Sequence, residues 1–151
     1  MAISLSVKPL HPRDLARFAL WVQRDIEADL APAHTLASLS TTQRHHPESL
    51  WGAYRKATLQ AGALLHWDHP SARLDLLVVA KAYRRQGLGQ QFMHALMAHA
   101  HAQQCQHIHI MVRAHNQAAR SFYAYLGAST LRLHPNYYPG LDDGIALELA
   151  L

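Results

Sequence analysis

Residues 79–89, Val79-Ala-Lys-Ala-Tyr-Arg-Arg-Gln-Gly-Leu-Gly89, decide the fold class of this chain of 151 residues. The apolar run 73–79 leads into them and ends in β-branched residues, which is typical of a buried strand. Apolar residues at helical spacing continue from them to about Gln104, which predicts a helix. A strand that passes through two closely spaced glycines into a helix indicates an α/β protein with a ligand-binding loop at the helix N-terminus.

The glycine loop, residues 84–89, has the residue types that suit a diphosphate. A helix N-terminus exposes unpaired backbone N–H groups and the positive end of the helix dipole. The two glycines let the backbone approach a ligand closely, while Arg84 and Arg85 add positive charge. The loop lacks the Gly-Lys-Ser/Thr of nucleotide triphosphate loops, and Phe92 stands where a dinucleotide fingerprint has its third glycine. These residues alone leave two interpretations open, a diphosphate site and a plain helix start.

Strand and helix signals alternate along the rest of the chain, and no internal repeat or linker divides it. We therefore expect one α/β domain over residues 1–151, with a mixed sheet and helices on its faces. The predicted strands are 2–9, 49–57, 59–67, 73–79, 107–113, 129–134 and 145–150. The first predicted helix is opened by Pro12 and Asp14 and has Leu15, Phe18, Ala19 and Val22 on one face. A second helix at about 30–40 has a weaker pattern, and further helices are predicted at 87–104 and 117–126. Residues 135–144 are predicted to form a long loop.

Composition and charge narrow the class of protein. No apolar run reaches the length of a membrane span and no signal peptide is recognisable, so we expect a cytoplasmic protein with no membrane partner. The net charge of +4 favours an anionic partner, but no block of like charges indicates nucleic-acid binding. The 13 histidines show no zinc-ligand spacing, so no metal site is expected.

A second segment, 116–127, has the signals of a helix with functional residues on it. Asn116 is a good N-cap and Gly127 suits the position just past the helix end. Asn116 and Tyr123 lie seven residues apart, about two helical turns, so they project from one side of the helix. For Asn116 a capping role alone stays open, and for Tyr123 the role of a core aromatic.

The spacing Arg84-x-x-Gly87-x-Gly89 resembles motif A of the GNAT acetyltransferases, here about 74–104. Asn116-x-x-Ala-x-x-Phe-Tyr123-x-x-x-Gly127 resembles the motif that follows it in that family, here about 107–127. The resemblance implies a single GNAT-type domain with about seven mostly antiparallel strands, a splayed strand pair at the cofactor site, and acetyl-CoA as cofactor. The cofactor-binding residues that it implies are Leu77, Val78, Val79, Arg84, Arg85, Gln86, Gly87, Leu88, Gly89, Gln90, Asn116 and Tyr123.

In that family the tyrosine hydroxyl corresponding to Tyr123 lies near the thioester sulfur and serves as general acid. The chemistry requires such a group, because negative charge develops on the leaving thiolate. A thiol has a pKa of about 8.5 and a phenol a pKa of about 10, so a positioned tyrosine can protonate the thiolate or donate a hydrogen bond to it. The resemblance thus implies transfer of acetyl to a primary amine, with Tyr123 as the acid.

Segments 113–116 and 136–139 resemble the ribosomal-protein alanine N-acetyltransferases, the RimI type. That type has a glutamate base five residues before the asparagine, and Met111 occupies this position here. The resemblance to the arylalkylamine acetyltransferases makes Asp75 the first candidate for the base, and His109, on the same strand face as Met111, is the second. A salt-bridged or sheet-edge carboxylate stays open for Asp75, and a polar strand position that faces solvent stays open for His109. Tyr137 and Tyr138 are expected to line the acceptor groove.

The expected acceptor is a peptide or protein N-terminus, or a small-molecule amine, and the expected state is a monomer or a homodimer. Two alternatives stay open. The methionine at position 111 is compatible with a non-catalytic CoA-binding regulatory domain. The basic charge is compatible with a nucleic-acid-binding module, but no other feature of the sequence favours that interpretation.

Overall fold

The computed structural model describes residues 4–30 and 33–151. The chain divides into two compact units, the first made of Met1–Leu65 with Leu76–Leu96 and the second of His66–Asp75 with Met97–Leu151. None of the helices in the described part of the chain is long and apolar enough to cross a membrane.

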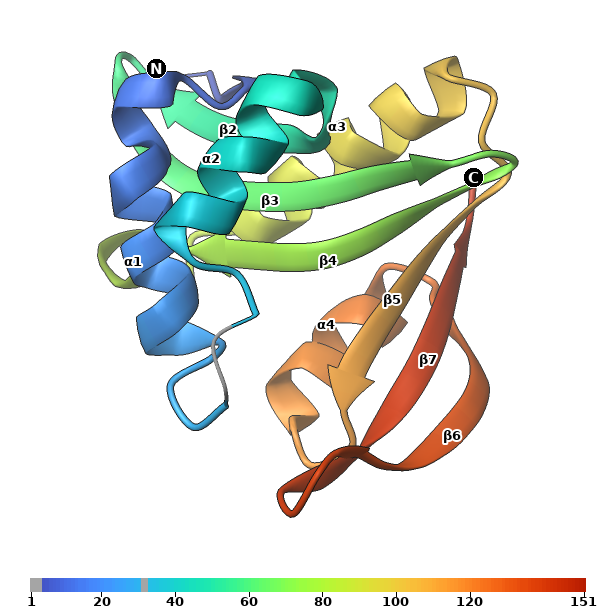
Figure 1. Cartoon of the computed structure of the whole chain (residues 1–151). Helices are drawn as coiled ribbons and strands as arrows, with labels where there is room; N and C mark the ends of the chain where they lie inside the picture. The colour runs from blue at the N-terminus through green and yellow to red at the C-terminus, as the bar shows by residue number, and fades with distance from the viewer. Residues whose placement is uncertain (1–3, 31–32) are drawn as a thin grey trace. The chain divides into compact units, whose positions relative to one another are not determined.

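Helices and strands alternate in the order that the sequence predicts, which confirms the α/β class (Figure 1). The strands are β1 Ser6–Pro9, β2 Leu50–Arg55, β3 Thr58–Asp68, β4 Ser71–Val79, β5 His107–Arg113, β6 Ser129–Tyr138 and β7 Asp142–Ala150. The α-helices are α1 Leu15–Asp25, α2 Leu36–His45, α3 Leu88–Ala102 and α4 Gln117–Tyr125, and the short 3-10 helices are η1 Pro12–Asp14, η2 Pro47–Ser49 and η3 Lys81–Tyr83.

The seven strands pair in the order β1-β2-β3-β4-β5-β7-β6, which confirms the predicted mixed sheet. The β4–β5 pair is parallel, whereas β1–β2, β2–β3, β5–β7 and β6–β7 are antiparallel. The parallel register covers only Ser71–Leu74 against His107–Ile110, although β4 continues to Val79 and β5 to Arg113. The ladder between them therefore ends halfway along, where the GNAT resemblance implies that the strands splay.

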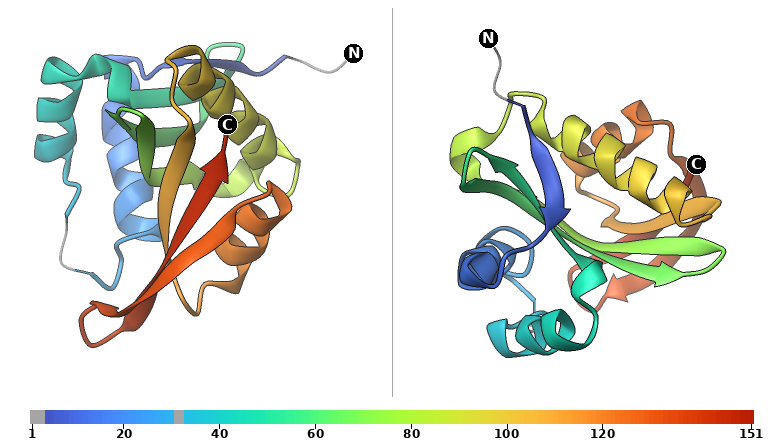
Figure 2. Two further views of the ribbon diagram at one scale, coloured as in Figure 1. Left: turned by 90° about the vertical axis from the view of Figure 1, so that its right-hand side faces the viewer. Right: turned by 90° about the horizontal axis from the view of Figure 1, so that it is seen from above.

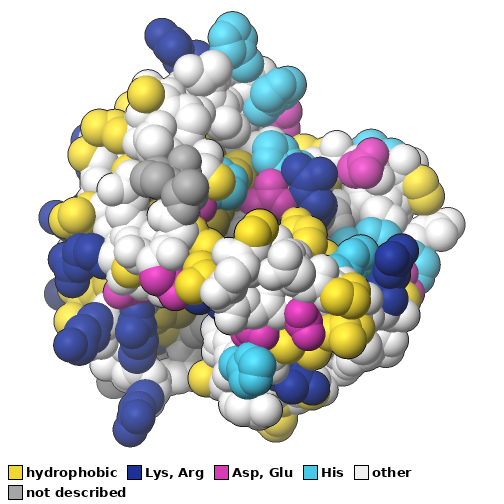
Figure 3. Space-filling model, turned by 60° about the horizontal axis from the view of Figure 1, so that its bottom comes forward, with side chains coloured by type: hydrophobic (Ala, Val, Ile, Leu, Met, Phe, Trp, Pro, Cys, Tyr) yellow, Lys and Arg dark blue, Asp and Glu magenta, His cyan; other side chains and the backbone are white. Residues whose placement is uncertain are grey.

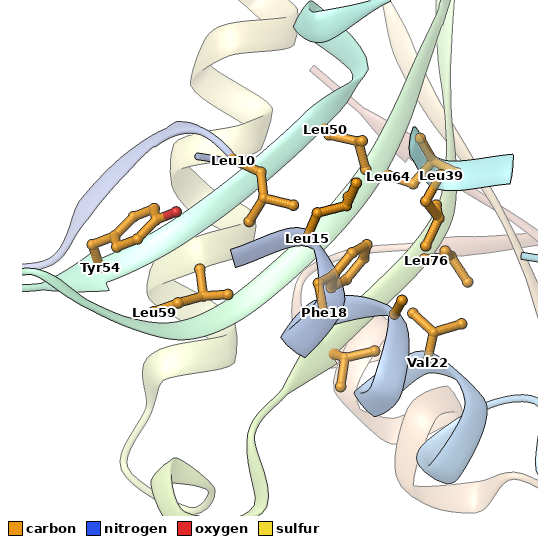
Figure 4. Close-up of a cluster of buried hydrophobic side chains, with 12 residues drawn as sticks. Leu10, Leu15, Phe18, Val22, Leu39, Leu50, Tyr54, Leu59, Leu64 and Leu76 are labelled. Carbon is orange, nitrogen blue, oxygen red and sulfur yellow. The ribbon is translucent and has the colours of Figure 1, made fainter. Parts of the chain in front are cut away.

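The core of the first unit lies between α1 and the strands beneath it. Helices α1 and α2 lie on one face of β2 and β3, and the first turns of α3 lie on the other (Figure 2). The predicted apolar face of α1 is buried, and its Phe18 ring lies so close to β3 that a Cβ on Gly62 would meet it at 2.4 Å. Figure 4 shows these side chains together with leucines from β2, β3 and β4.

Helix α2 begins later than the sequence predicts. It spans Leu36–His45 instead of about 30–40, and residues 31 and 32 of the predicted range lie outside the described residues. Thr35 and Ser38 form a capping box, since the side chain of each accepts from the backbone N–H of the other, at 3.1 and 2.9 Å. A cap that satisfies two N–H groups fixes the start of the helix more firmly than the weak apolar pattern does.

The prediction of a long loop at 135–144 is wrong. Strand β6 runs to Tyr138 and β7 starts at Asp142, so the two form a hairpin with a short turn that contains Gly140. Pro135, Asn136 and Gly140 are typical of loops, but pairing of β6 with β7 overrides that local preference. A register shift between His134 and Tyr138 accommodates the positive φ of Asn136.

A buried phenol–carboxylate contact holds the start of α1 against β2. The Tyr54 hydroxyl donates to Asp14 Oδ2 at 2.8 Å and accepts from the His11 backbone N–H at 3.0 Å. Asp14, predicted to open the helix, accepts this bond and makes no side-chain cap of its own. Burial raises the pKa of Tyr54 to about 12, so the phenol stays protonated and continues to donate over the whole neutral range.

We expect Tyr54→Phe to lower the free energy of unfolding by about 1–3 kcal/mol, because it leaves a buried carboxylate and a backbone N–H without the hydroxyl. Urea denaturation of the purified chain measures the loss. Tyr125→Phe is the matched control, since Tyr125 is 75% exposed and its change should stay within about 0.5 kcal/mol. Equal effects of the two variants would contradict the assignment.

Candidate functional site

The glycine loop has the backbone geometry of an anion site. Arg85 and Gly87 have φ of 62° and 75°, so the chain turns through left-handed conformations immediately before α3. A Cβ on Gly87 would meet no atom within 4 Å, which leaves open space beside the backbone. The first helical hydrogen bond runs from Gln91 N to Gly87 O at 3.1 Å, so the N–H groups of the three residues between them begin the helix without an intrahelical acceptor. Such N–H groups and the helix dipole favour a bound anion.

The two arginines of the loop have different surroundings. The Arg84 side chain donates from Nε to Val79 O and from Nη2 to Asp25 Oδ2, both at 2.9 Å. It therefore ties the loop to the end of β4 and to the last residue of α1. Arg85 is exposed. The sequence predicted both as positive charges for a ligand, and it contained no sign that Asp25 pairs with Arg84.

Strand β4 presents alternate residues to the two faces of the sheet. Val78 is buried with Leu76, whereas Leu77 and Val79 are partly exposed on the opposite face. The side chain of Leu88 is also buried, so this residue can offer only its backbone to a ligand. Of the predicted cofactor-binding residues, Arg84–Gly87 are exposed, and Gly89 and Gln90 are partly exposed.

Helix α4 of the second unit carries the other predicted motif. Asn116 Oδ1 accepts from the Ala119 backbone N–H at 3.0 Å, so the predicted N-cap is confirmed. Tyr123 is 7% exposed, and its ring meets Phe122 edge to face with centroids 5.0 Å apart. Burial raises the pKa of Tyr123, which keeps the phenol protonated at neutral pH, the state that a general acid requires.

Histidine, acidic and basic side chains lie beside one another on the face shown in Figure 3. In the second unit the Asp75 carboxylate contacts a guanidinium and an imidazole. Arg73 donates from Nε to Asp75 Oδ1 at 2.7 Å and from Nη2 to Oδ2 at 3.2 Å, and His66 Nε2 lies 3.0 Å from Oδ2. The hydrogen bond to Asp75 raises the pKa of Arg73. The first candidate for the base is therefore a carboxylate with both oxygens bonded, and His66 is a neighbour that only the β3–β4 pairing brings to it.

The second candidate, His109, has a carboxylate partner from another strand. His109 is in direct register with Glu148 of β7, and its Nε2 lies 2.8 Å from Glu148 Oε2. His107 stacks on His109 with ring centroids 6.2 Å apart, and its Nε2 lies 3.7 Å from Glu148 Oε1. Glu148 lies almost forty residues further along the chain, so spacing could not indicate this pair.

Tyr137 and Tyr138 lie at the end of strand β6 and not in a loop. Their rings meet edge to face with centroids 5.0 Å apart, and the Arg113 guanidinium lies 5.3 Å from the centroid of Tyr138. Tyr137 is 50% exposed, which leaves its ring available to a partner. In the described part of the chain, no cluster of three or more His, Cys, Asp or Glu side chains could hold a metal ion.

A model of the acetyltransferase (GNAT) family matches residues 15–128, and this range contains both the glycine loop and α4. The chain belongs to the GNAT family. It is thus an acetyltransferase that uses acetyl-CoA, as the paired motifs predicted. No curated protein matches the chain.

Solved structures show the same GNAT fold over almost the whole chain. Ard1 from Thermoplasma volcanium is 21% identical with a TM-score of 0.85, and the match covers 97% of each chain. The ribosomal-protein-S18-alanine N-acetyltransferase from Escherichia coli is 23% identical with a TM-score of 0.81, covering 97% of this chain and 94% of that one. The yncA protein from Salmonella typhimurium, solved with acetyl-CoA, is 12% identical with a TM-score of 0.80, at 97% and 94% coverage.

The glycine loop of this acetyltransferase fits the pyrophosphate of acetyl-CoA. The backbone N–H groups of Leu88, Gly89 and Gln90 precede the first helical bond, and the open side of Gly87 gives an anion access to them. Arg84 and Arg85 are both exposed cations, and Arg84 also fixes the position of the loop through Asp25. We propose that these residues hold the pyrophosphate mainly by backbone contacts.

We expect Gly87→Ala to weaken acetyl-CoA binding by about tenfold or more, because a methyl group would fill the space through which the anion reaches the N–H groups. Isothermal titration calorimetry measures this dissociation constant. Gly140→Ala is the matched control, since its φ of 73° and empty surroundings give the same backbone strain without a helix N-terminus beside it. An equal effect of both replacements on binding would contradict the loop's role.

Proposed function

We propose that this acetyltransferase transfers acetyl from acetyl-CoA to the α-amine of a peptide or protein. The observation that carries the proposal is the pairing of Asp75, whose two carboxylate oxygens are bonded to Arg73 and His66. An acceptor amine must be neutral to attack, and deprotonation at pH 7 costs about 1 kcal/mol for an α-amine but about 4–5 kcal/mol for a lysine side chain. A site whose first candidate base is already a paired carboxylate suits the amine that needs the weaker base.

Structural neighbours support a peptide acceptor. The Escherichia coli neighbour is by its name a ribosomal-protein-S18-alanine N-acetyltransferase, and a further neighbour is a NatC complex bound to Gag peptide and CoA. These neighbours are 23% and 19% identical to the chain, so the likeness is one of fold. A peptide or protein N-terminus as the acceptor is therefore a proposal. Tyr137, half exposed at the end of β6, would offer an aromatic ring to the acceptor, with Tyr138 fixed behind it by Arg113.

The proposed reaction is direct transfer without an acetylated protein residue. Acetyl-CoA supplies a thioester, and its departing thiolate needs a proton or a hydrogen bond. Tyr123 is the proposed donor, because its buried phenol is protonated at neutral pH and a hydrogen bond given from an apolar site is stronger than one in water. Asp75 and His109 are the two proposed acceptors of the amine proton, and each has a partner in the fold.

We expect acetyl-CoA turnover with peptides that have a free N-terminus, and little with polyamines or aminoglycosides. Release of the CoA thiol, followed with a thiol reagent, measures the rate, and mass spectrometry locates the acetyl group. Blocking the N-terminus of the same peptides is the control. Turnover of blocked, lysine-containing peptides would contradict the proposed acceptor, and acetyl-CoA binding without transfer to any amine would favour a regulatory domain instead.

We expect Tyr123→Phe to lower kcat by about 10²–10⁴-fold while the dissociation constant of acetyl-CoA stays within about threefold, as for loss of a general acid. Steady-state kinetics with the best peptide and calorimetry with acetyl-CoA measure the two quantities. Tyr125→Phe removes an exposed hydroxyl from the same helix and should leave both unchanged. An unaltered rate and pH profile in Tyr123→Phe would exclude it as the acid.

A further inference from the structure

His109 and Glu148 form a cross-strand pair on the partly exposed face of the second unit. Strands β5 and β7 are antiparallel here, and the two residues stand directly opposite each other in the register. The 2.8 Å contact joins Nε2 of the imidazole to Oε2 of the carboxylate, and the two side chains are 41% and 26% exposed. Both groups are therefore reachable by a substrate and held in one geometry.

The carboxylate partner fixes which nitrogen of His109 accepts a proton. A neutral imidazole carries its proton on the nitrogen that faces a carboxylate, because that nitrogen is then the hydrogen-bond donor. Nδ1 is left as the acceptor, and among the described residues no hydrogen bond or ion pair engages it. An imidazole with one nitrogen bonded to a carboxylate and the other available has the arrangement that general bases use.

Asp75 is in the opposite situation. Arg73 binds it through two nitrogens and His66 through a third, so a proton arriving on this carboxylate would disrupt charge-assisted hydrogen bonds. Its observed contacts give it a different task, which is to hold Arg73 and His66 in place. Position 73 is also in register with His109 on the neighbouring strand, so Asp75 offsets the positive charge beside that imidazole.

We propose that His109 is the general base and that Glu148 is its positioning residue. This inference rests on the proposed function and refines it. The acceptor nitrogen forms a bond to the acetyl carbonyl carbon, and its proton passes to Nδ1 of His109. The carbon–sulfur bond breaks, and the CoA thiolate takes its proton from Tyr123. Glu148 keeps the imidazole in the required tautomer and stabilises the imidazolium that forms.

The charged groups around His109 come from three strands. Glu148 faces it from β7, His107 stacks on it from β5 and shares Glu148 at 3.7 Å, and Arg73 lies opposite it on β4 with Asp75 as counter-charge. Strand β6 contributes no titratable side chain in register with Glu148, since Ser129 pairs with it there. Glu148 is therefore the negative charge in direct contact with His109, and its removal would take away the group that orients the imidazole.

The test compares pH profiles of kcat/KM for the full chain with its best peptide, for the unchanged protein and five variants. His109→Gln should lose about 10²-fold or more and lose the fall in rate on acidification. Glu148→Gln should lose about tenfold, because the imidazole loses the carboxylate that fixes its tautomer, while Glu148→Asp should recover part of the rate. His107→Gln is the control and should remain within about twofold.

Acetyl-CoA binding by calorimetry and the melting temperature show that each variant is folded. A fall in rate on acidification that persists in His109→Gln but disappears in Asp75→Asn would overturn the proposal in favour of Asp75. A loss of rate in Glu148→Gln that Glu148→Asp does not recover at all would overturn the positioning role. Absence of transfer by the unchanged protein would overturn the proposed function and the base with it, whereas normal transfer by His109→Gln overturns the base alone.

Discussion

Two parallel strands cannot be joined by a tight turn, and the pairing of β4 with β5 is the constraint from which the rest of the site follows. The chain needs a long crossover between them, and α3 provides it. The crossover must start where β4 ends, so a helix N-terminus with unpaired N–H groups lies directly after that strand. The left-handed residues Arg85 and Gly87 make the change of direction within a few residues, and they leave those N–H groups accessible.

The same pairing arranges the charges of the second unit. Alternation along β4 and β5 places Arg73 and Asp75 on one face with His107 and His109, and the antiparallel partner β7 adds Glu148 to it. Each carboxylate then takes specific partners, Asp75 a guanidinium and an imidazole, and Glu148 two imidazoles. The guanidinium of Arg73 bonds both oxygens of Asp75, whereas each oxygen of Glu148 faces an imidazole. Two similar acidic side chains on one surface thus acquire different chemistry from their neighbours.

Much of the fold could be predicted, because strong local signals and tertiary packing agree. The α1 face of Leu15, Phe18 and Val22 is buried as its spacing predicts, and the alternation along β5 matches its pairing on both sides. The β6–β7 hairpin was missed, because Pro135, Asn136 and Gly140 carry loop signals that the long antiparallel ladder overrides. The predicted position of α2 was wrong by several residues. The apolar periodicity of this helix is weak, and its start is set by hydrogen bonds between Thr35 and Ser38 that the apolar pattern does not show.

The sequence by itself determined the strand–glycine loop–helix unit, the N-cap at Asn116 and hence the family, because these features depend on residues close together in the chain. Only the tertiary structure decided what each charged group does. The contacts that decide this join residues that are separated in the chain. Asp25 and Arg84 are 59 positions apart, His66 and Asp75 are 9 apart, and His109 and Glu148 are 39 apart. Strand register and helix packing set such contacts, and a change of one residue in register turns a side chain to the other face. For that reason the cofactor could be identified from local sequence, whereas the partner of the base depends on the sheet.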